Sequence, residues 1–394
     1  MAIGNPPSRE AGPRRRRGPT IGNSFPARLA LATASLIALL GTLSLACSRH
    51  SYVPQPYLAV VVNSGSNSVA VVDLASFHVV ASIPVEGGPE QLAVRPGSRE
   101  VWVTGASGRL SVVGFPELRV IRTLHVGRGA RDLRFAPGGR EAYVLDPAEG
   151  QIVFLDCAAG KVAAGVRVGS PLSRLVLAPD GRTLVAASSV ANRIFFVSVE
   201  SRKLLGSVEV GKEPGPMALM LDGSKVFVAN TGEEKISSAD LGSRQILSHI
   251  EIGVRPSALL LKPDGGELFV LSAPASTLVI MDPWRDNVSQ TITTGRQPAA
   301  AVMRRDSTML YIANAGDGSV TTFDVQNRLV VASTHAGTEP RALALTPDER
   351  FLVVADGATA SLAILRTDRS ALVTTIPVGA QPVDVVVPDW QLKE

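Results

Sequence analysis

The feature that most constrains this chain is a repeat of about 42 residues that runs through residues 57–388. An apolar run ends in a glycine once per period, and six successive spacings between these glycines are all 42 residues. Glu86 holds the equivalent place in the earliest copy, and the marker glycines after it are Gly127, Gly169, Gly211, Gly253, Gly295, Gly337 and Gly379. A fixed period of this length indicates an array of one structural unit, so 394 residues do not imply several domains.

Each period contains four short apolar runs separated by turn residues. Around the first marker the runs read VAVVD at 69–73, VVASIPV at 79–85, QLAV at 91–94 and VWVTG at 101–105. Turns such as APDGRT at 178–183 contain the Pro, Asp and Gly that tight turns favour. The runs lack a 3.6-residue apolar period, which predicts strands and disfavours helical repeats. A four-stranded sheet buries both faces only when it packs between neighbours, so the pattern predicts the blades of a β-propeller.

The number of strands predicts how the ring closes. There are eight sets of second, third and fourth strands and eight first strands, the last of which is PVDVVV at 382–387. The chain therefore starts with a second strand and ends with a first strand, and we expect the C-terminal strand to complete the N-terminal blade. The predicted fold class is all-β, a single propeller of four-stranded antiparallel blades. Eight blades fit the count best, and seven are the alternative.

The motifs within one period also resemble a known family. The segment at 61–104 reads VVNSGSNSVAVVDLASFHVVASIPVEGGPEQLAVRPGSREVWVT. It resembles the YVTN β-propeller repeat of bacterial and archaeal surface and periplasmic proteins, and the resemblance extends over residues 57–388. The literal Tyr-Val-Thr-Asn string is absent, and VWVTG, VFVAN and LYIAN stand in its place.

The positive charge of the chain is concentrated at its N-terminus. Residues 1–46 contain six arginines, no lysine and one acid, and the other residues include 33 basic and 34 acidic side chains. The net charge of +4 therefore describes the N-terminal segment and is no indication that the repeat region binds nucleic acid.

The N-terminal segment itself predicts export. Arginines at 14–17 and Arg28 precede the uncharged run LALATASLIALLGTLSL at 29–45, which is the pattern of a secretory signal. The run ends in LSLAC, which resembles the bacterial lipobox, and this resemblance implies that Cys47 becomes a lipidated N-terminus facing the periplasm or the cell exterior. An uncleaved anchor helix is the alternative. The predicted organisation is a lipoprotein-type signal peptide at 1–46, a lipidated terminus and tether at 47–56, the propeller at 57–388 and a tail at 389–394.

The sequence shows little sign of catalytic chemistry. The five histidines are scattered, and no HExxH, GxSxG, P-loop or CxxCH string occurs. The first strands, which line the channel of a propeller, are small and apolar at their centres apart from Arg134, which leaves few groups for acid–base or metal chemistry. Cys157 follows Asp156 in an expected turn and is predicted to be a free, partly exposed thiol. We therefore predict no catalytic residues, no metal and no cofactor.

The loops after the marker glycines are the candidate binding face. Acidic residues such as Glu90, Asp132, Glu339 and Asp384 alternate there with basic ones and should weaken the positive field. Loops on a rigid scaffold commonly carry binding residues, and ring geometry should gather these loops around one mouth of the channel. The predicted binding residues are Arg128, Arg131, Arg255, Arg296 and Arg341.

These observations predict a non-catalytic binding or scaffold module that is anchored to a membrane through lipid and binds another component of the cell envelope. The first alternative is a lactonase-like hydrolase, because some propellers of similar appearance are lactonases. The second is a single-stranded nucleic-acid binder, which would need a basic groove with stacking aromatic side chains. Neither the charge of residues 47–394 nor the chain's three tryptophans favour that alternative.

Overall fold

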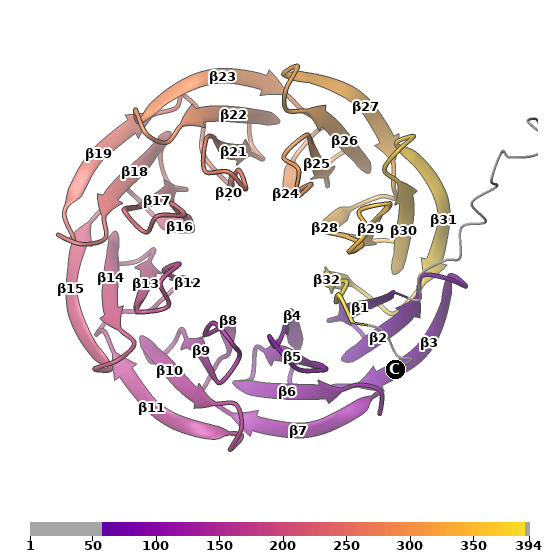
Figure 1. The fold of residues 1–394 in the computed structure, drawn as a ribbon, viewed down its shortest axis with the longest axis horizontal. Coiled ribbons are helices and arrows are strands. Elements are labelled where there is room, and N and C mark those ends of the chain that lie inside the picture. The colour runs from indigo at the N-terminus through magenta and orange to yellow at the C-terminus, as the bar shows by residue number, and fades with distance from the viewer. Residues whose placement is uncertain (1–56, 391–394) are drawn as a thin grey trace, which may run out of the picture. The chain divides into compact units, whose positions relative to one another are not determined.

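The computed structural model describes residues 57–390, which form a ring of eight four-stranded antiparallel sheets (Figure 1). Seven of these blades consist of four consecutive strands, and the eighth combines the first three strands of the chain with its last strand. The prediction of eight blades closed by the C-terminal strand is therefore confirmed. Residues 57–390 contain no helical segment with the length and hydropathy of a membrane span.

The inner strand of each blade lines the central channel and corresponds to the first apolar run of the repeat. The inner strands are β4 (Pro89–Val94), β8 (Arg131–Phe135), β12 (Arg174–Leu177), β16 (Pro214–Leu219), β20 (Ala258–Leu261), β24 (Pro298–Met303), β28 (Pro340–Leu345) and β32 (Pro382–Val386).

The two middle strands of each blade are almost wholly buried and form the core. The second strands are β1 (Leu58–Asn63), β5 (Glu100–Gly105), β9 (Glu141–Asp146), β13 (Thr183–Ser188), β17 (Lys225–Asn230), β21 (Leu268–Ser272), β25 (Met309–Asn314) and β29 (Phe351–Asp356). The third strands are β2 (Ser68–Asp73), β6 (Arg109–Gly114), β10 (Gln151–Asp156), β14 (Arg193–Ser198), β18 (Lys235–Asp240), β22 (Thr277–Asp282), β26 (Ser319–Asp324) and β30 (Ser361–Arg366).

Side chains alternate along these strands, so each blade packs on both of its neighbours. In β1, Val60 and Val62 pack against the blade of β5, whereas Ala59 and Val61 pack against the blade of β29. The described residues form eight apolar clusters, one at each boundary between neighbouring blades.

The outer strands carry a β-bulge at one repeated position. They are β3 (His78–Pro84), β7 (Arg119–His125), β11 (Lys161–Arg167), β15 (Lys203–Glu209), β19 (Ile246–Glu251), β23 (Asn287–Thr293), β27 (Leu329–His335) and β31 (Ala371–Pro377). In all eight, the register with the third strand shifts beside the residue six places before the marker. A bulge twists a free strand edge and discourages pairing with another chain.

Ring closure depends on β32. This strand pairs antiparallel with β1, with Val61 opposite Val385 and Val62 opposite Asp384. Just after β32, the ring of Trp390 lies 4.6 Å from that of Phe115, between ring centroids. The last described residues therefore contact both the first blade and its neighbour.

Five of the seven marker glycines leave room for a buried polar side chain at the end of a second strand, whereas a Cβ at Gly169 or Gly253 would meet no atom within 4 Å. Gly337 has a φ of +140°, and a Cβ atom there would lie 1.7 Å from Oδ2 of Asp356. Asp356 is fully buried and accepts a hydrogen bond from the backbone N–H of Glu339 at 3.0 Å. Burial raises the pKa of Asp356, but hydrogen bonds from the N–H groups of Thr338 and Glu339 outweigh it and hold that pKa below its ordinary value.

One sequence prediction about Cys157 is wrong. The residue directly follows β10, as expected, but its side chain is fully buried in the apolar cluster between the blades of β5 and β9. Burial raises the pKa of the thiol to about 11. The sequence indicates the turn at Cys157, but it gives no sign that the neighbouring blade covers the side chain.

Candidate functional site at the channel mouth

One face of the ring is built from two kinds of loop, as predicted. The loop that enters an inner strand lies against the loop between the second and third strands of the same blade. The N–H of Ala106 donates to the carbonyl of Gly88 at 2.9 Å, and the N–H of Thr231 donates to that of Glu213 at 3.1 Å. We call this face the channel mouth.

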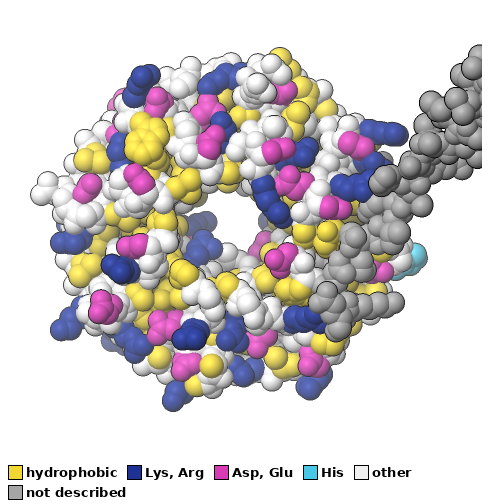
Figure 2. All heavy atoms as spheres, viewed as in Figure 1, with side chains coloured by type: hydrophobic (Ala, Val, Ile, Leu, Met, Phe, Trp, Pro, Cys, Tyr) yellow, Lys and Arg dark blue, Asp and Glu magenta, His cyan; other side chains and the backbone are white. Residues whose placement is uncertain are grey.

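The mouth contains a hollow of about 670 Å³ that opens into the channel. Figure 2 shows the ring from the face opposite the mouth, where basic and acidic side chains are mixed around the central hole of the channel. The charged side chains that line the mouth hollow are Glu90, Arg131, Asp132, Arg174, Arg341 and Asp384.

Two of the five predicted arginines line this hollow. Arg131 begins β8, and its Nε lies 3.0 Å from Oε2 of Glu90 on the neighbouring β4. Arg341 lies near the start of β28, and its Nη2 lies 2.6 Å from Oε1 of Glu339. About half of each arginine side chain is exposed, so both are available to a ligand.

The other three predicted arginines do not line the mouth hollow. Arg128 is directed to Glu149, with Nε and Oε1 3.2 Å apart, and is 80% exposed. Arg255 lines a separate hollow between the blades of β12, β16 and β20. Arg296 is exposed, and its backbone N–H donates to Oδ2 of Asp317 at 2.7 Å.

Arg174 is the third arginine that lines the mouth hollow. Its Nη1 donates to the backbone carbonyl of Ser173 at 2.9 Å, and it has no carboxylate partner among residues 57–390. It was not among the predicted binding residues. It begins β12, so its side chain is carried by an inner strand and faces the hollow.

A single repeat position divides the channel into a polar and an apolar half. The residue five places after the marker lies at or near the start of the inner strand in every blade. In ring order from the blade of β32, these residues are Asp384, Gln91, Asp132, Arg174, Pro216, Ala258, Ala300 and Ala342. The expectation of apolar strand centres does not extend to these strand starts, which are polar in four consecutive blades.

Asp384 is the most perturbed carboxyl group at the mouth. Its Oδ2 accepts the N–H of Leu92 on β4 at 2.8 Å, and its Oδ1 accepts the N–H of Val385 at 2.9 Å. Burial raises the pKa of Asp384 to about 6, while those hydrogen bonds and the charge of Arg134 act in the opposite direction. In the sequence, Asp384 is the single acidic residue of the closing strand PVDVVV.

Asp132 links β8 to the next inner strand in a similar way. Its Oδ2 accepts the N–H of Leu175 at 2.9 Å, and Arg134 Nε donates to the carbonyl of the same residue at 3.1 Å. Asp132 and Arg134 thus hold both backbone polar groups of Leu175, which fixes the two side chains against the channel wall.

The described residues offer little to hold a metal or an axially ligated cofactor. Among them, no group of three or more His, Cys, Asp and Glu side chains is arranged to hold a metal ion. The four histidines within 57–390 lie on outer strands, at His78, His125, His249 and His335. Ser237 Oγ and His249 Nδ1 are 2.9 Å apart, but Ser237 is fully buried, so a substrate has no access to this pair.

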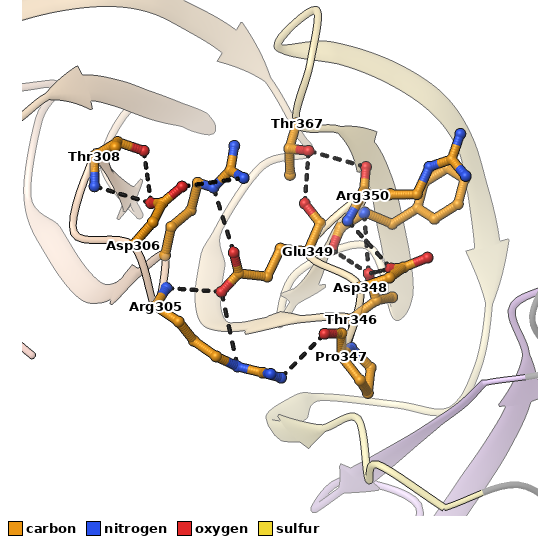
Figure 3. Close-up of polar contacts among 11 residues, drawn as sticks. Arg305, Asp306, Thr308, Thr346, Pro347, Asp348, Glu349, Arg350 and Thr367 are labelled. Carbon is orange, nitrogen blue, oxygen red and sulfur yellow. Dashed lines mark hydrogen bonds and ion pairs between the residues drawn. The ribbon is translucent and has the colours of Figure 1, made fainter.

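The opposite face joins neighbouring blades through its turns (Figure 3). Glu349, in the turn after β28, accepts the backbone N–H of Arg305 at 2.7 Å, and Arg305 Nη2 donates to the carbonyl of Pro347 at 3.1 Å. Within that same turn, Thr346 Oγ1 donates to Oδ1 of Asp348 at 2.6 Å. These contacts pair donors and acceptors of the two neighbouring turns with one another, so this region is a structural junction between blades.

Comparison with known proteins agrees with the fold. The family model described as "Lactonase, 7-bladed beta-propeller" matches residues 276–384, which run from β22 into β32. Among curated proteins, no sequence matches the chain.

Solved structures resemble the chain in fold at low sequence identity. Dihydro-heme d1 dehydrogenase NirN in complex with DHE is 17% identical with a TM-score of 0.70, over 89% of this chain and 78% of that one. AztD from Citrobacter koseri is 14% identical with a TM-score of 0.65, over 84% of this chain and 97% of its own. Hydrazine synthase of Kuenenia stuttgartiensis is 18% identical with a TM-score of 0.55, over 71% and 98%.

Proposed function

We propose that the chain is an exported, lipid-anchored propeller of the YVTN type that binds an anionic group of another cell-envelope component at the channel mouth, without catalysis. The observation that carries this proposal is the convergence of Arg131, Arg174 and Arg341 on one hollow of a rigid ring. Each exposed arginine alone contributes little, but several around a concave surface raise the local potential and speed the capture of an anion.

The neighbouring acids make the proposed site selective. Glu90 and Glu339 neutralise part of the charge of Arg131 and Arg341, so net charge alone does not attract every anion. Arg174, without a carboxylate partner among the described residues, supplies the donors that a partner's carboxylate or phosphate would accept.

The binding proposal is tested by capture from detergent-solubilised cell envelope. We expect a variant with Arg131, Arg174 and Arg341 all changed to alanine to capture less of the partner while folding normally, since exposed substitutions each cost under about 0.5 kcal/mol. The matched control changes three exposed arginines in turns of the opposite face, and it should capture as much as the wild type. Those control residues are Arg182, Arg285 and Arg369. Equal capture by both variants would show that the mouth is not the binding site.

Export and lipidation are proposed from the sequence alone, because residues 1–56 lie outside the described residues. Two or more acyl chains are needed for stable anchoring. Cys47→Ala should abolish labelling by a radioactive fatty acid and move the protein out of the membrane fraction. Equal labelling of the wild type and the variant would refute the lipid anchor.

A second candidate function, lactone hydrolysis, is favoured by two observations. A lactonase family model matches residues 276–384, and the carboxyl group of Asp384 has a pKa of about 6 in a hollow that faces solvent. A carboxylate with that pKa suits general base catalysis near neutral pH. A panel of lactones, tested with and without divalent metal, decides between the two functions. If the wild type hydrolyses a lactone and Asp384→Asn does not, the non-catalytic proposal is wrong.

A further inference from the structure

A second hollow, of about 530 Å³, lies within the channel next to the mouth hollow. Gln91 and Ala300 border both hollows, so the two are continuous along the channel wall. The other residues that line this channel hollow are Arg134, Ala258, Leu259, Leu260, Phe269, Leu271 and Ala301. Its volume falls in the range of about 300–1,000 Å³ that small-molecule sites usually have.

The walls of the channel hollow differ in chemistry across the ring. Gln91 comes from β4 and Arg134 from β8, and Figure 1 shows that these strands lie across the channel from β20 and β24. The wall formed by β20 and β24 presents alanine and leucine side chains only, and these are partly exposed. A ligand that spans the channel therefore meets a cationic and amide wall on one side and an apolar wall on the other.

Arg134 has hydrogen-bond donors left for a ligand. Its guanidinium group has five N–H donors, and Nε uses one of them on the carbonyl of Leu175 at 3.1 Å. No group within residues 57–390 accepts from the others. That one bond orients the side chain, and partial burial makes unused donors costly, which favours a ligand that accepts two parallel hydrogen bonds.

Asp384 limits the charge of such a ligand. Each carboxylate oxygen of Asp384 accepts one backbone N–H, from Leu92 or Val385, and no hydrogen bond joins this group to Arg134 within residues 57–390. It still places a negative charge close enough to Arg134 for the two to interact. A ligand with a second negative charge would be repelled by Asp384, whereas a single carboxylate is balanced by Arg134.

We infer that the channel hollow binds a small amphipathic monocarboxylate, with its carboxylate on Arg134 and its apolar body against β20 and β24. Gln91 supplies an additional amide beside the carboxylate. The apolar body gains about 0.8 kcal/mol for each CH₂ group that it buries, which gives affinity to chains of several carbons and little to acetate. This site adjoins the proposed binding face, but it requires neither the lipid anchor nor a partner at the mouth.

The test is calorimetric titration of the protein with octanoate, octanol, octylammonium and acetate at pH 7.5. Octanoate should bind at least about ten-fold more tightly than the other three, because they lack either the charge or the apolar body. Arg134→Gln should weaken octanoate by about ten-fold or more, and Arg134→Lys should retain part of the affinity, since lysine keeps the charge but not the paired donors. Arg182→Gln, at an exposed turn of the opposite face, is the matched control and should bind octanoate as the wild type does.

A second variant separates loss of the site from loss of the fold. Ala300→Phe fills the channel from the apolar side and leaves Arg134 in place, and we expect it to weaken octanoate while the melting temperature stays near that of the wild type. The inference is overturned if octanol binds as well as octanoate, or if a folded Arg134→Gln keeps the wild-type affinity. If Arg134→Gln does not fold, the Ala300→Phe variant decides, because undiminished affinity there also overturns the inference.

Discussion

Replacing Asp384 by asparagine should stabilise the protein at alkaline pH and not at acid pH. The carboxyl group lies on the closing strand β32, partly exposed to the channel, and accepts backbone N–H groups from Leu92 and Val385. Burial raises its pKa from an ordinary 3.8 to about 6. The folded chain therefore binds this proton at a higher pH than the unfolded chain, and the stability associated with it is lost as the pH rises from about 4 through 6.

The expected magnitude follows from that shift. Roughly two pH units correspond to about 3 kcal/mol of destabilisation by the ionised Asp384 at pH 8. Asparagine keeps one acceptor for the N–H of Leu92 and loses the acceptor for Val385, which costs about 1 kcal/mol. Asp384→Asn should therefore stabilise the fold by about 1–2 kcal/mol at pH 8, and at pH 4.5 the difference should disappear or change sign.

Urea unfolding of both proteins from pH 4.5 to pH 8 measures this difference directly. The matched control is Asp222→Asn, at an exposed turn where hydrogen bonds from the side chain and backbone of Ser224 lower the carboxyl pKa. Asp222 is ionised throughout this pH range in both states, so its effect should be constant. If the effect of Asp384→Asn were equally constant, burial would not raise the pKa of Asp384, and its role as a candidate base would fail with it.

Three further predictions concern the ring. Cys157 should be alkylated by iodoacetamide only after unfolding, as measured by peptide mass spectrometry, and rapid labelling of the folded protein would contradict its burial. Deletion of residues 382–394 removes β32 and should lower the melting temperature by roughly 10 °C or more, whereas a smaller loss would show that the ring does not depend on strand closure. Gly337→Ala forces a Cβ atom to within 1.7 Å of Asp356 Oδ2 and should cost more than about 2 kcal/mol in urea unfolding. The control Gly253→Ala, with no atom within 4 Å but a φ of +72°, should cost only about 1 kcal/mol, and equal losses would rule out the clash as the cause.

The strands of each blade could be predicted because the repeat pattern depends only on residues within that blade. Spacing between the marker glycines was enough to locate four strands per blade and the closing role of PVDVVV at the C-terminus, and β32 pairs with β1 as expected. The glycines themselves were only markers in the sequence. Their reason, a buried side chain such as Asp356 in the space that a Cβ would fill, depends on how two loops approach each other.

Contacts between blades could not be predicted in the same way. Cys157 is covered by side chains of the neighbouring blade, and Arg128 is directed to Glu149 instead of the channel. The burial of Cys157 depends on side chains of the neighbouring blade, and the direction of Arg128 depends on how two loops of its own blade approach each other. No local sequence pattern reports either arrangement. Arg131 and Arg341 line the mouth hollow because they lie at or near the start of inner strands, a position that the repeat itself defines.

The candidate sites lie where the repeat is broken. Eight identical blades would give a channel with eight equivalent walls, and such a channel could not orient an asymmetric ligand. The position five places after the marker holds Asp384 and Asp132 in one half of the ring and Ala258 and Ala300 in the other. Both halves have the same backbone, so the difference in chemistry comes from side chains alone, held in place by the blade-to-blade bonds of Asp384 to Leu92 and of Asp132 to Leu175. Exchange of a single polar position, such as Asp132→Ala, should therefore change what the channel binds without changing the ring that surrounds it.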